Sequence, residues 1–346
     1  MKKIKGAIKM KIRGLLLLMV FLLLSTMISL VSFAQTTEYP SEWPERLTIT
    51  SGTMGGGWYP VMVRFGDLIM KEIPGLYVNV IEGGSLANTR VVNEGRDAQM
   101  GLTYIDVFFK ARDGYFGDPI PQNISYGFGL MVAYQFVAVP LDSNIKTMGD
   151  IWDKRILGGI FGSGQDMFLY ALADTYDKDI DKIDEYGGTL SGLSLTDSAL
   201  QLVDGHGDVA FFGSSSLCKC PNIQEVEMSF PVRILEFEEG MKDKFLQVNP
   251  FYIPETIPAG CYKGQGEKPV ELVGVPCVFI FNNKLPASFV KEIMRVLVNK
   301  TDQLQEEFPG ALSMLEKDKY LKGQEVKYMH PGVIDLAEEL SLPMGN

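Results

Sequence analysis

A strand, a glycine-rich turn and the start of a helix follow one another several times along this chain of 346 residues. Alternation at 46–50 predicts a strand, the glycines of 51–57 predict a loop, and apolar residues at helical spacing after Pro60 predict a helix. The same order returns at 76–93 and at 157–176. Strands that alternate with helices in this way predict a mostly parallel α/β sheet.

A second internal similarity indicates two related lobes. Residues 88–95 predict a helix that ends at a glycine, and a strand follows at 98–103. Residues 198–205 and 208–212 repeat this pattern. The sequence therefore favours a duplicated architecture.

Apolar strands at 135–139 and 275–281 are expected near the crossings between these lobes. An amphipathic helix at 289–308 is expected to pack back on the first lobe. We place lobe I at 46–134 plus 270–346 and lobe II at 135–269.

The N-terminus has the three-part layout of a secretory signal. Six basic residues precede the apolar run 14–24, and small residues stand at Ser32 and Ala34, before the expected cut. We predict a signal peptide at 1–34, a flexible start at 35–45 and a periplasmic or otherwise extracytoplasmic location. The alternative is an uncleaved signal anchor, because the apolar region is long enough to span a bilayer.

Without residues 1–34 the chain has 26 basic and 43 acidic residues, a net charge of −17. This charge argues against nucleic acid or an anionic membrane surface as a partner. The hydrophobic share of 46% excludes a disordered chain. An anionic ligand would have to be held by local geometry against the overall field.

Cysteine and histidine are scarce. The two histidines, His206 and His330, argue against a His-dependent hydrolase or a multi-His metal site, and Pro331 and Gly332 after His330 indicate a structural turn. We predict no catalytic residue, metal or cofactor. An exported protein can form disulfides, and only the pairing of Cys218 with Cys220 is disfavoured, by their closeness in sequence. The four cysteines are Cys218, Cys220, Cys261 and Cys277.

The glycine loops are the candidate anion-binding elements. The first N–H groups of a helix lack intrahelical partners, and the helix dipole adds partial positive charge, so a glycine loop before a helix can hold a carboxylate or phosphate. Loops from two facing lobes would converge on one cleft. A nucleotide site fits poorly, because 51–57 is not GxGxxG; a serine hydrolase fits poorly, because neither 162–164 nor 213–216 completes GxSxG.

Several side chains are candidates for the wall of this cleft. Trp58 and Tyr59 follow the first loop and either line the pocket or pack in the core, and Tyr104 ends a strand where a pocket would lie. Arg64 and Arg90 are candidate carboxylate partners, although helix arginines are more often solvated.

Five motifs in this order resemble the TAXI family, the TRAP-associated extracytoplasmic solute receptors. They lie at 51–60, 83–88, 162–164, 257–262 and 330–332. The resemblance covers nearly all of the chain after the signal. It implies a type II periplasmic binding protein fold, in which two Rossmann-like or flavodoxin-like α/β lobes enclose a ligand cleft.

The resemblance also implies a function. Such receptors capture a small organic anion, a carboxylate or an amino acid such as glutamate, and deliver it to a TRAP-type membrane permease; we expect a monomer that is not an enzyme. The family usually has Thr at the positions of Met54 and Gly57 and Tyr at that of Trp58, so this chain is expected to take a less polar ligand or another carboxylate. The alternatives are an enzyme on the same fold and a ligand-sensing partner of a membrane kinase.

The expected ligand-binding residues come from four loops and the strand end at Tyr104. They are Thr53, Met54, Gly55, Gly56, Gly57, Trp58, Tyr59, Ser85, Asn88, Tyr104, Ser163, Gly164, Gln165 and Ser214.

Overall fold

The computed structural model describes residues 39–346 apart from 55, 118, 317–318, 322–324 and 345–346. The predicted signal peptide at 1–34 lies outside the described residues. The chain divides into two compact units, 1–41 and 42–346, and the second contains the described helices and strands. No helix in the described part of the chain combines the length and apolar character that a membrane crossing requires.

Lobe I begins with three parallel strands. Strand β1 lies between β2 and β3, and the helices follow the strands in the predicted order. Helix α3 ends at Gly95, whose φ of 72° is the left-handed conformation that glycine adopts without strain. The elements are β1 (Arg46–Thr50), α2 (Trp58–Glu72), β2 (Tyr77–Ile81), α3 (Ser85–Glu94) and β3 (Met100–Tyr104).

Lobe II repeats this unit, as the internal similarity predicted. Strand β5 lies between β6 and β7 and is parallel to both. Ser163 and Ser194 are the N-cap residues of α5 and α6, and their hydroxyls accept backbone N–H groups of the first turn. The elements are β5 (Arg155–Gly159), α5 (Gly164–Thr175), η2 (Ile180–Tyr186), β6 (Thr189–Leu193), α6 (Leu195–Val203) and β7 (Val209–Ser214).

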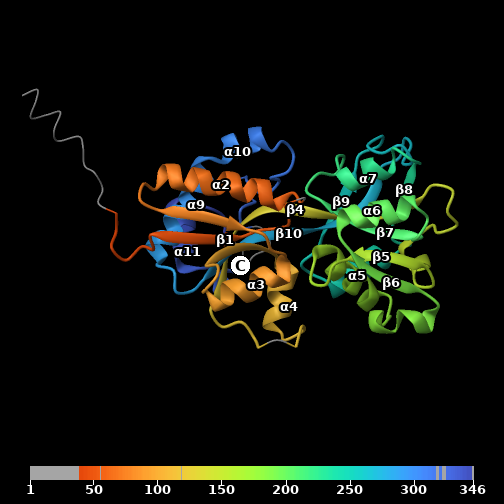
Figure 1. Cartoon of the computed structure of the whole chain (residues 1–346), viewed down its shortest axis with the longest axis horizontal. Coiled ribbons are helices and arrows are strands. Elements are labelled where there is room, and N and C mark those ends of the chain that lie inside the picture. Colours follow the sequence, from red (N-terminus) through yellow and green to blue (C-terminus); the bar gives the residue numbers. More distant parts are fainter. Residues whose placement is uncertain (1–38, 55, 118, 317–318, 322–324, 345–346) are drawn as a thin grey trace, which may run out of the picture. The chain divides into compact units, whose positions relative to one another are not determined.

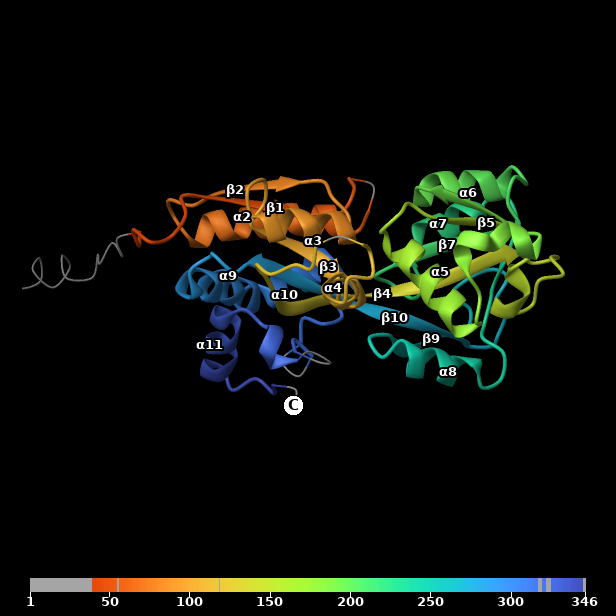
Figure 2. The same ribbon diagram turned by 90° about the horizontal axis from the view of Figure 1, so that it is seen from below.

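Two long antiparallel strands, β4 (Ile124–Pro140) and β10 (Val270–Asn282), join the two groups of strands (Figure 2). The sequence predicted only 135–139 and 275–281 of them. The sheet order is β2-β1-β3-β10-β4-β7-β5-β6. Each lobe follows the flavodoxin-like order for its three parallel strands, but the next strand is antiparallel, because it comes from one of the two long strands. This is the predicted type II periplasmic binding protein fold.

Helices cover both faces of the sheet. In lobe I, α2 lies on one side and α3 and α4 (Ile105–Arg112) on the other (Figure 1). The predicted helix 289–308 is two helices, α9 (Ala287–Asn299) and α10 (Thr301–Glu307), which are interrupted at Lys300. Helix α9 packs on α2 and on α11 (Pro331–Glu339) in lobe I, as expected. The other elements are η1 (Met148–Ile151), α7 (Pro221–Val226), β8 (Val232–Ile234), α8 (Met241–Val248), β9 (Ile253–Ile257), η3 (Val326–Tyr328) and α11 (Pro331–Glu339).

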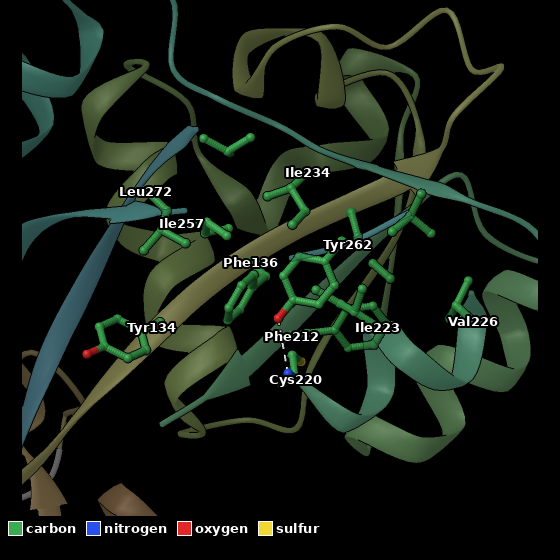
Figure 3. Close-up of a cluster of buried hydrophobic side chains, with 14 of the residues drawn as sticks. Tyr134, Phe136, Phe212, Cys220, Ile223, Val226, Ile234, Ile257, Tyr262 and Leu272 are labelled. Carbon is green, nitrogen blue, oxygen red and sulfur yellow. Dashed lines mark hydrogen bonds between the residues drawn. The ribbon is translucent and has the colours of Figure 1, made fainter. Parts of the chain in front are cut away.

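A core cluster in lobe II fixes the segment after β7 (Figure 3). The Tyr262 hydroxyl accepts the backbone N–H of Cys220 at 3.0 Å and donates to the carbonyl of Leu217 at 2.9 Å. Cys218 and Cys261 form a disulfide, whereas Cys220 and Cys277 are free and buried. The pairing that the sequence left open is therefore between the segment after β7 and the one after β9.

Candidate ligand-binding site

A cavity of about 160 Å³ lies where the glycine loops of both lobes meet. The loops after β1, β2, β5 and β7 contribute to it, together with the end of β3 and the middle of β4. The lining residues are Gly52, Thr53, Gly56, Gly57, Trp58, Gly83, Gly84, Ser85, Tyr104, Met131, Ala133, Ser163, Gly164, Gln165, Leu195, Gly213, Ser214 and Ser215.

Helices α2, α3 and α5 begin at this cavity, and so does α6, whose first residue, Leu195, lines it. The backbone N–H groups of Gly57 and Trp58 at α2, Ser85 at α3, and Gly164 and Gln165 at α5 have no hydrogen-bond acceptor among the residues that the structure describes. They are the donors that a helix leaves unpaired in its first turn. Both lobes therefore present positive N–H groups toward the same space.

An aromatic wall closes one side. The rings of Trp58 and Tyr104 are 4.8 Å apart between centroids, and the Trp58 side chain hydrogen-bonds to the buried thiol of Cys277. The Tyr104 hydroxyl and the Gln165 amide have no hydrogen-bond partner within the described residues, although these side chains are only 9% and 7% exposed. Both are free to bond to a ligand.

The two lobes touch at the rim of the cavity. The N–H of Leu86 in α3 donates to the carbonyl of Gly162 before α5 at 3.4 Å. A Cβ atom on Gly164 would lie 2.4 Å from the ring of Tyr104, so only glycine fits this approach. The structure is thus the closed arrangement, in which the loops face one another at contact distance.

A model of the NMT1-like family matches residues 49–339. The chain belongs to the NMT1-like family. The match spans both lobes and therefore includes every loop that lines the cavity.

Solved structures are similar to this NMT1-like chain at low identity. The alkanesulfonate-binding protein SsuA from Xanthomonas axonopodis pv. citri, bound to MOPS, is 16% identical, with 87% of this chain and 81% of that chain covered and a TM-score of 0.46. A structure from work on glutathione import via GshT and TcyBC of Streptococcus mutans is 13% identical, with 82% and 99% covered and a TM-score of 0.48. Full-length BenM is 13% identical, with 83% and 75% covered and a TM-score of 0.44. At these values the similarities carry no argument about ligands.

Most predicted site residues of this NMT1-like chain line the cavity. Met54, Tyr59 and Asn88 do not, and Gly55 lies outside the described residues. Met54 is 67% exposed on the outer side of the first loop. The predicted residues that do line it are Thr53, Gly56, Gly57, Trp58, Ser85, Tyr104, Ser163, Gly164, Gln165 and Ser214.

Asn88 does not line the cavity but hydrogen-bonds to the backbone of the segments that do. It is fully buried, and its amide donates to the carbonyls of Ser51 and Leu102, both at 2.7 Å. Its oxygen accepts the Gly84 N–H at 3.0 Å and the Thr50 hydroxyl at 2.6 Å. One side chain thus ties the ends of β1 and β3 to the start of α3.

Two serine hydroxyls are already engaged. The Ser85 oxygen accepts the N–H of Tyr104 at 2.8 Å and shares a hydrogen bond with the Thr103 hydroxyl at 2.8 Å. The Ser163 hydroxyl accepts the N–H of Asp166 at 3.3 Å. Ser85 therefore offers the cavity mainly its backbone N–H. The backbone N–H of Ser163 donates to the carbonyl of Ile160 at 2.9 Å, so Ser163 offers the hydrogen of its hydroxyl.

The two candidate arginines are not at the cavity. Arg64 forms a bidentate ion pair with Glu307, with Nε–Oε2 and Nη2–Oε1 distances of 2.5 and 2.8 Å. Arg90 is absent from the lining. Within the described residues no cluster of three or more His, Cys, Asp or Glu is arranged to hold a metal ion.

Sequence reasoning missed eight lining residues. Met131 and Ala133 stand in the almost uniformly buried strand β4, where no alternation marks the face that meets the ligand. Leu195 begins α6 and carried no motif. The remainder are glycines and a serine beside predicted positions: Gly52, Gly83, Gly84, Gly213 and Ser215.

Asp166 is expected to make anion binding depend on pH. It lies in the first turn of α5 and accepts the Gly162 N–H at 2.8 Å. Burial raises the pKa of this carboxyl to about 6; the Gly162 hydrogen bond and Lys110 oppose the rise, and Asp181 adds to it. Since a bound anion repels the carboxylate, anion binding favours the protonated form.

The affinity for an anion that stays ionised above pH 5 is therefore expected to rise about three- to tenfold as the pH falls from 8 to 5. Isothermal titration calorimetry across this range checks it. Asp166→Asn should flatten the profile, and Asp174→Asn, a change farther along α5, should leave it intact. A profile that is equally steep in Asp166→Asn would contradict the assignment.

Proposed function

We propose that this protein is an extracytoplasmic receptor that captures a small organic anion, a carboxylate in the first instance, and delivers it to a TRAP-type membrane permease. The proposal rests on one observation: unpaired backbone N–H groups from three helix starts, in two lobes, surround one small cavity. Such groups hold an anion without a basic side chain. The TAXI-like motifs support the permease as the partner, and we expect a monomer.

The two lobes suit a capture mechanism. An anion that contacts Gly57 and Trp58 in lobe I and Gly164 and Gln165 in lobe II stabilises the closed form over an open one, because only the closed form offers both sets of donors. β4 and β10 are the connections that can flex between these forms. The membrane permease would then recognise the closed, ligand-bound form of the receptor.

An enzyme on this fold would need a reactive group at the cavity. The candidates, Cys218, Cys220 and His206, are absent from the lining: Cys218 is in the disulfide with Cys261, Cys220 is buried in the core, and His206 contacts Gln201. Their placement supports the receptor over the enzyme. A sensor for a membrane kinase would use the same cavity and differ only in the partner.

A thermal-shift screen of carboxylates, sulfonates and amino acids on ligand-stripped protein tests the proposal. A ligand at 100 times its Kd adds about 2.7 kcal/mol of stability, which raises the melting temperature by about 5 °C for a chain of this size. We expect such a shift with at least one anion and none with matched neutral amides. The absence of a shift with every anion would overturn the receptor proposal.

A further inference from the structure

The described lining of the cavity contains no charged side chain. Two buried carboxylates that are close in sequence to lining residues have hydrogen bonds of their own: Asp166 accepts the Gly162 N–H, and Asp106 accepts the Val107 N–H and the Tyr252 hydroxyl. Neither Asp106 nor Asp166 lines the cavity. The charge on the ligand is thus met by backbone N–H groups and neutral side chains alone.

From this lining we infer that the ligand is an organic monoanion that carries neither an ammonium group nor a second carboxylate. The inference rests on the proposed function and narrows it. It sets aside both glutamate and other α-amino acids, which the family resemblance suggested as ligands.

No side chain in the described lining can act as a counter-ion for an ammonium group. The N–H groups of Gly57, Ser85 and Gly164 repel a cation, and no lining side chain is a carboxylate. A buried ammonium without a paired charge costs several kcal/mol. The binding free energy of a zwitterionic amino acid would therefore be less favourable, by several kcal/mol, than that of the same acid without its amino group.

A second carboxylate has no cation to pair with in the described lining. The two candidate arginines lie away from the lining, and Arg64 is held by Glu307. The backbone N–H groups that would surround one carboxylate would have to be divided between two. The net charge of the chain without residues 1–34 is −17, which also opposes a second negative charge. A dianion is therefore bound less well than a monoanion of the same length.

The rest of the lining fits a neutral, apolar body. Trp58 and Tyr104 contribute aromatic rings to the lining, and Met131, Ala133 and Leu195 contribute apolar side chains. Such surfaces bind flat or aliphatic carbon skeletons. Aliphatic and aromatic monocarboxylates have both a carboxylate for the backbone N–H groups and a carbon skeleton for the apolar side chains.

Two matched ligand sets test the inference by calorimetry. The first is butanoate, 2-aminobutanoate and succinate; the second is phenylacetate, phenylglycine and 2-carboxyphenylacetate. We expect the monoanion of at least one set to bind tenfold or more tightly than its two relatives. An amino acid or dianion that binds as tightly as its monoanion, or that binds when no monoanion does, overturns the inference and leaves the receptor proposal standing; no binding by any anion in the wider screen overturns the receptor proposal.

A variant pair tests the role of charge directly. Leu195 lines the cavity at the first residue of α6, so Leu195→Lys adds the missing cation and Leu195→Gln changes shape without charge. We expect Leu195→Lys to raise the affinity for the dianion relative to the monoanion tenfold or more, and Leu195→Gln to keep the ratio within threefold. An unchanged ratio in Leu195→Lys would contradict the claim that the uncharged lining sets the preference.

Discussion

Gly164→Ala is expected to weaken ligand binding by about 10- to 100-fold without lowering the stability of the unliganded protein. The new Cβ would lie 2.4–2.7 Å from three atoms of the Tyr104 side chain, so the lobes could not reach the closed arrangement without moving that ring. Tyr104 packs on Trp58 and is nearly buried, so the movement disturbs the aromatic wall. Overpacking of this kind costs about 1–3 kcal/mol.

Gly164→Ala is not expected to destabilise lobe II itself. Gly164 is the first residue of α5, and alanine favours a helix by up to about 1 kcal/mol over glycine. The comparison variant is Gly84→Ala: Gly84 also lines the cavity, but a Cβ there meets no protein atom within 4 Å, so this variant adds a methyl group to the lining without a contact between the lobes. Calorimetry and melting curves separate the two effects. Binding by Gly164→Ala within threefold of the unmodified protein would show that closure at this contact is not required.

Asn88→Ala is expected to lower the free energy of unfolding by about 3–5 kcal/mol and the melting temperature by about 10 °C. The carbonyls of Ser51 and Leu102 and the N–H of Gly84 would lose their partner in a buried site. Each buried polar group left unpaired costs about 1–3 kcal/mol. Denaturant unfolding measures the change.

Asn93→Ala on the same helix is the control. Its oxygen accepts the N–H groups of Gln122 and Asn123 in an exposed position, and its loss should cost about 1 kcal/mol or less. If Asn88→Ala kept full stability but lost ligand binding, Asn88 would be a direct ligand contact, as the sequence suggested, and not a support.

The local features of the fold could be predicted, and the long-range ones could not. The glycine loops at 51–57 and 162–164 and the helices after them follow from turn chemistry and apolar spacing, which act within a few residues. The full length of β4 and its pairing with β10 depend on partners more than a hundred residues away. Both strands are almost uniformly buried, so no alternation of polar and apolar residues marks them. Such strands were recognised only in part.

The site shows the same division. Residues such as Gly57 and Gly164 were predicted because helix starts have known unpaired donors. The face of β4 that places Ala133 at the cavity, and the contacts that turn Asn88 inward, exist only once the strands are assembled. A polar side chain near a glycine loop cannot be assigned to ligand or scaffold before its partners are known.

A crystal structure of the protein with its ligand tests the central claim most directly. We predict that the anionic group lies within about 3.2 Å of backbone nitrogens from both lobes, among them those of Gly57 or Trp58 and of Gly164 or Gln165. An anionic group held by an arginine or lysine side chain, or bound to one lobe only, would contradict it.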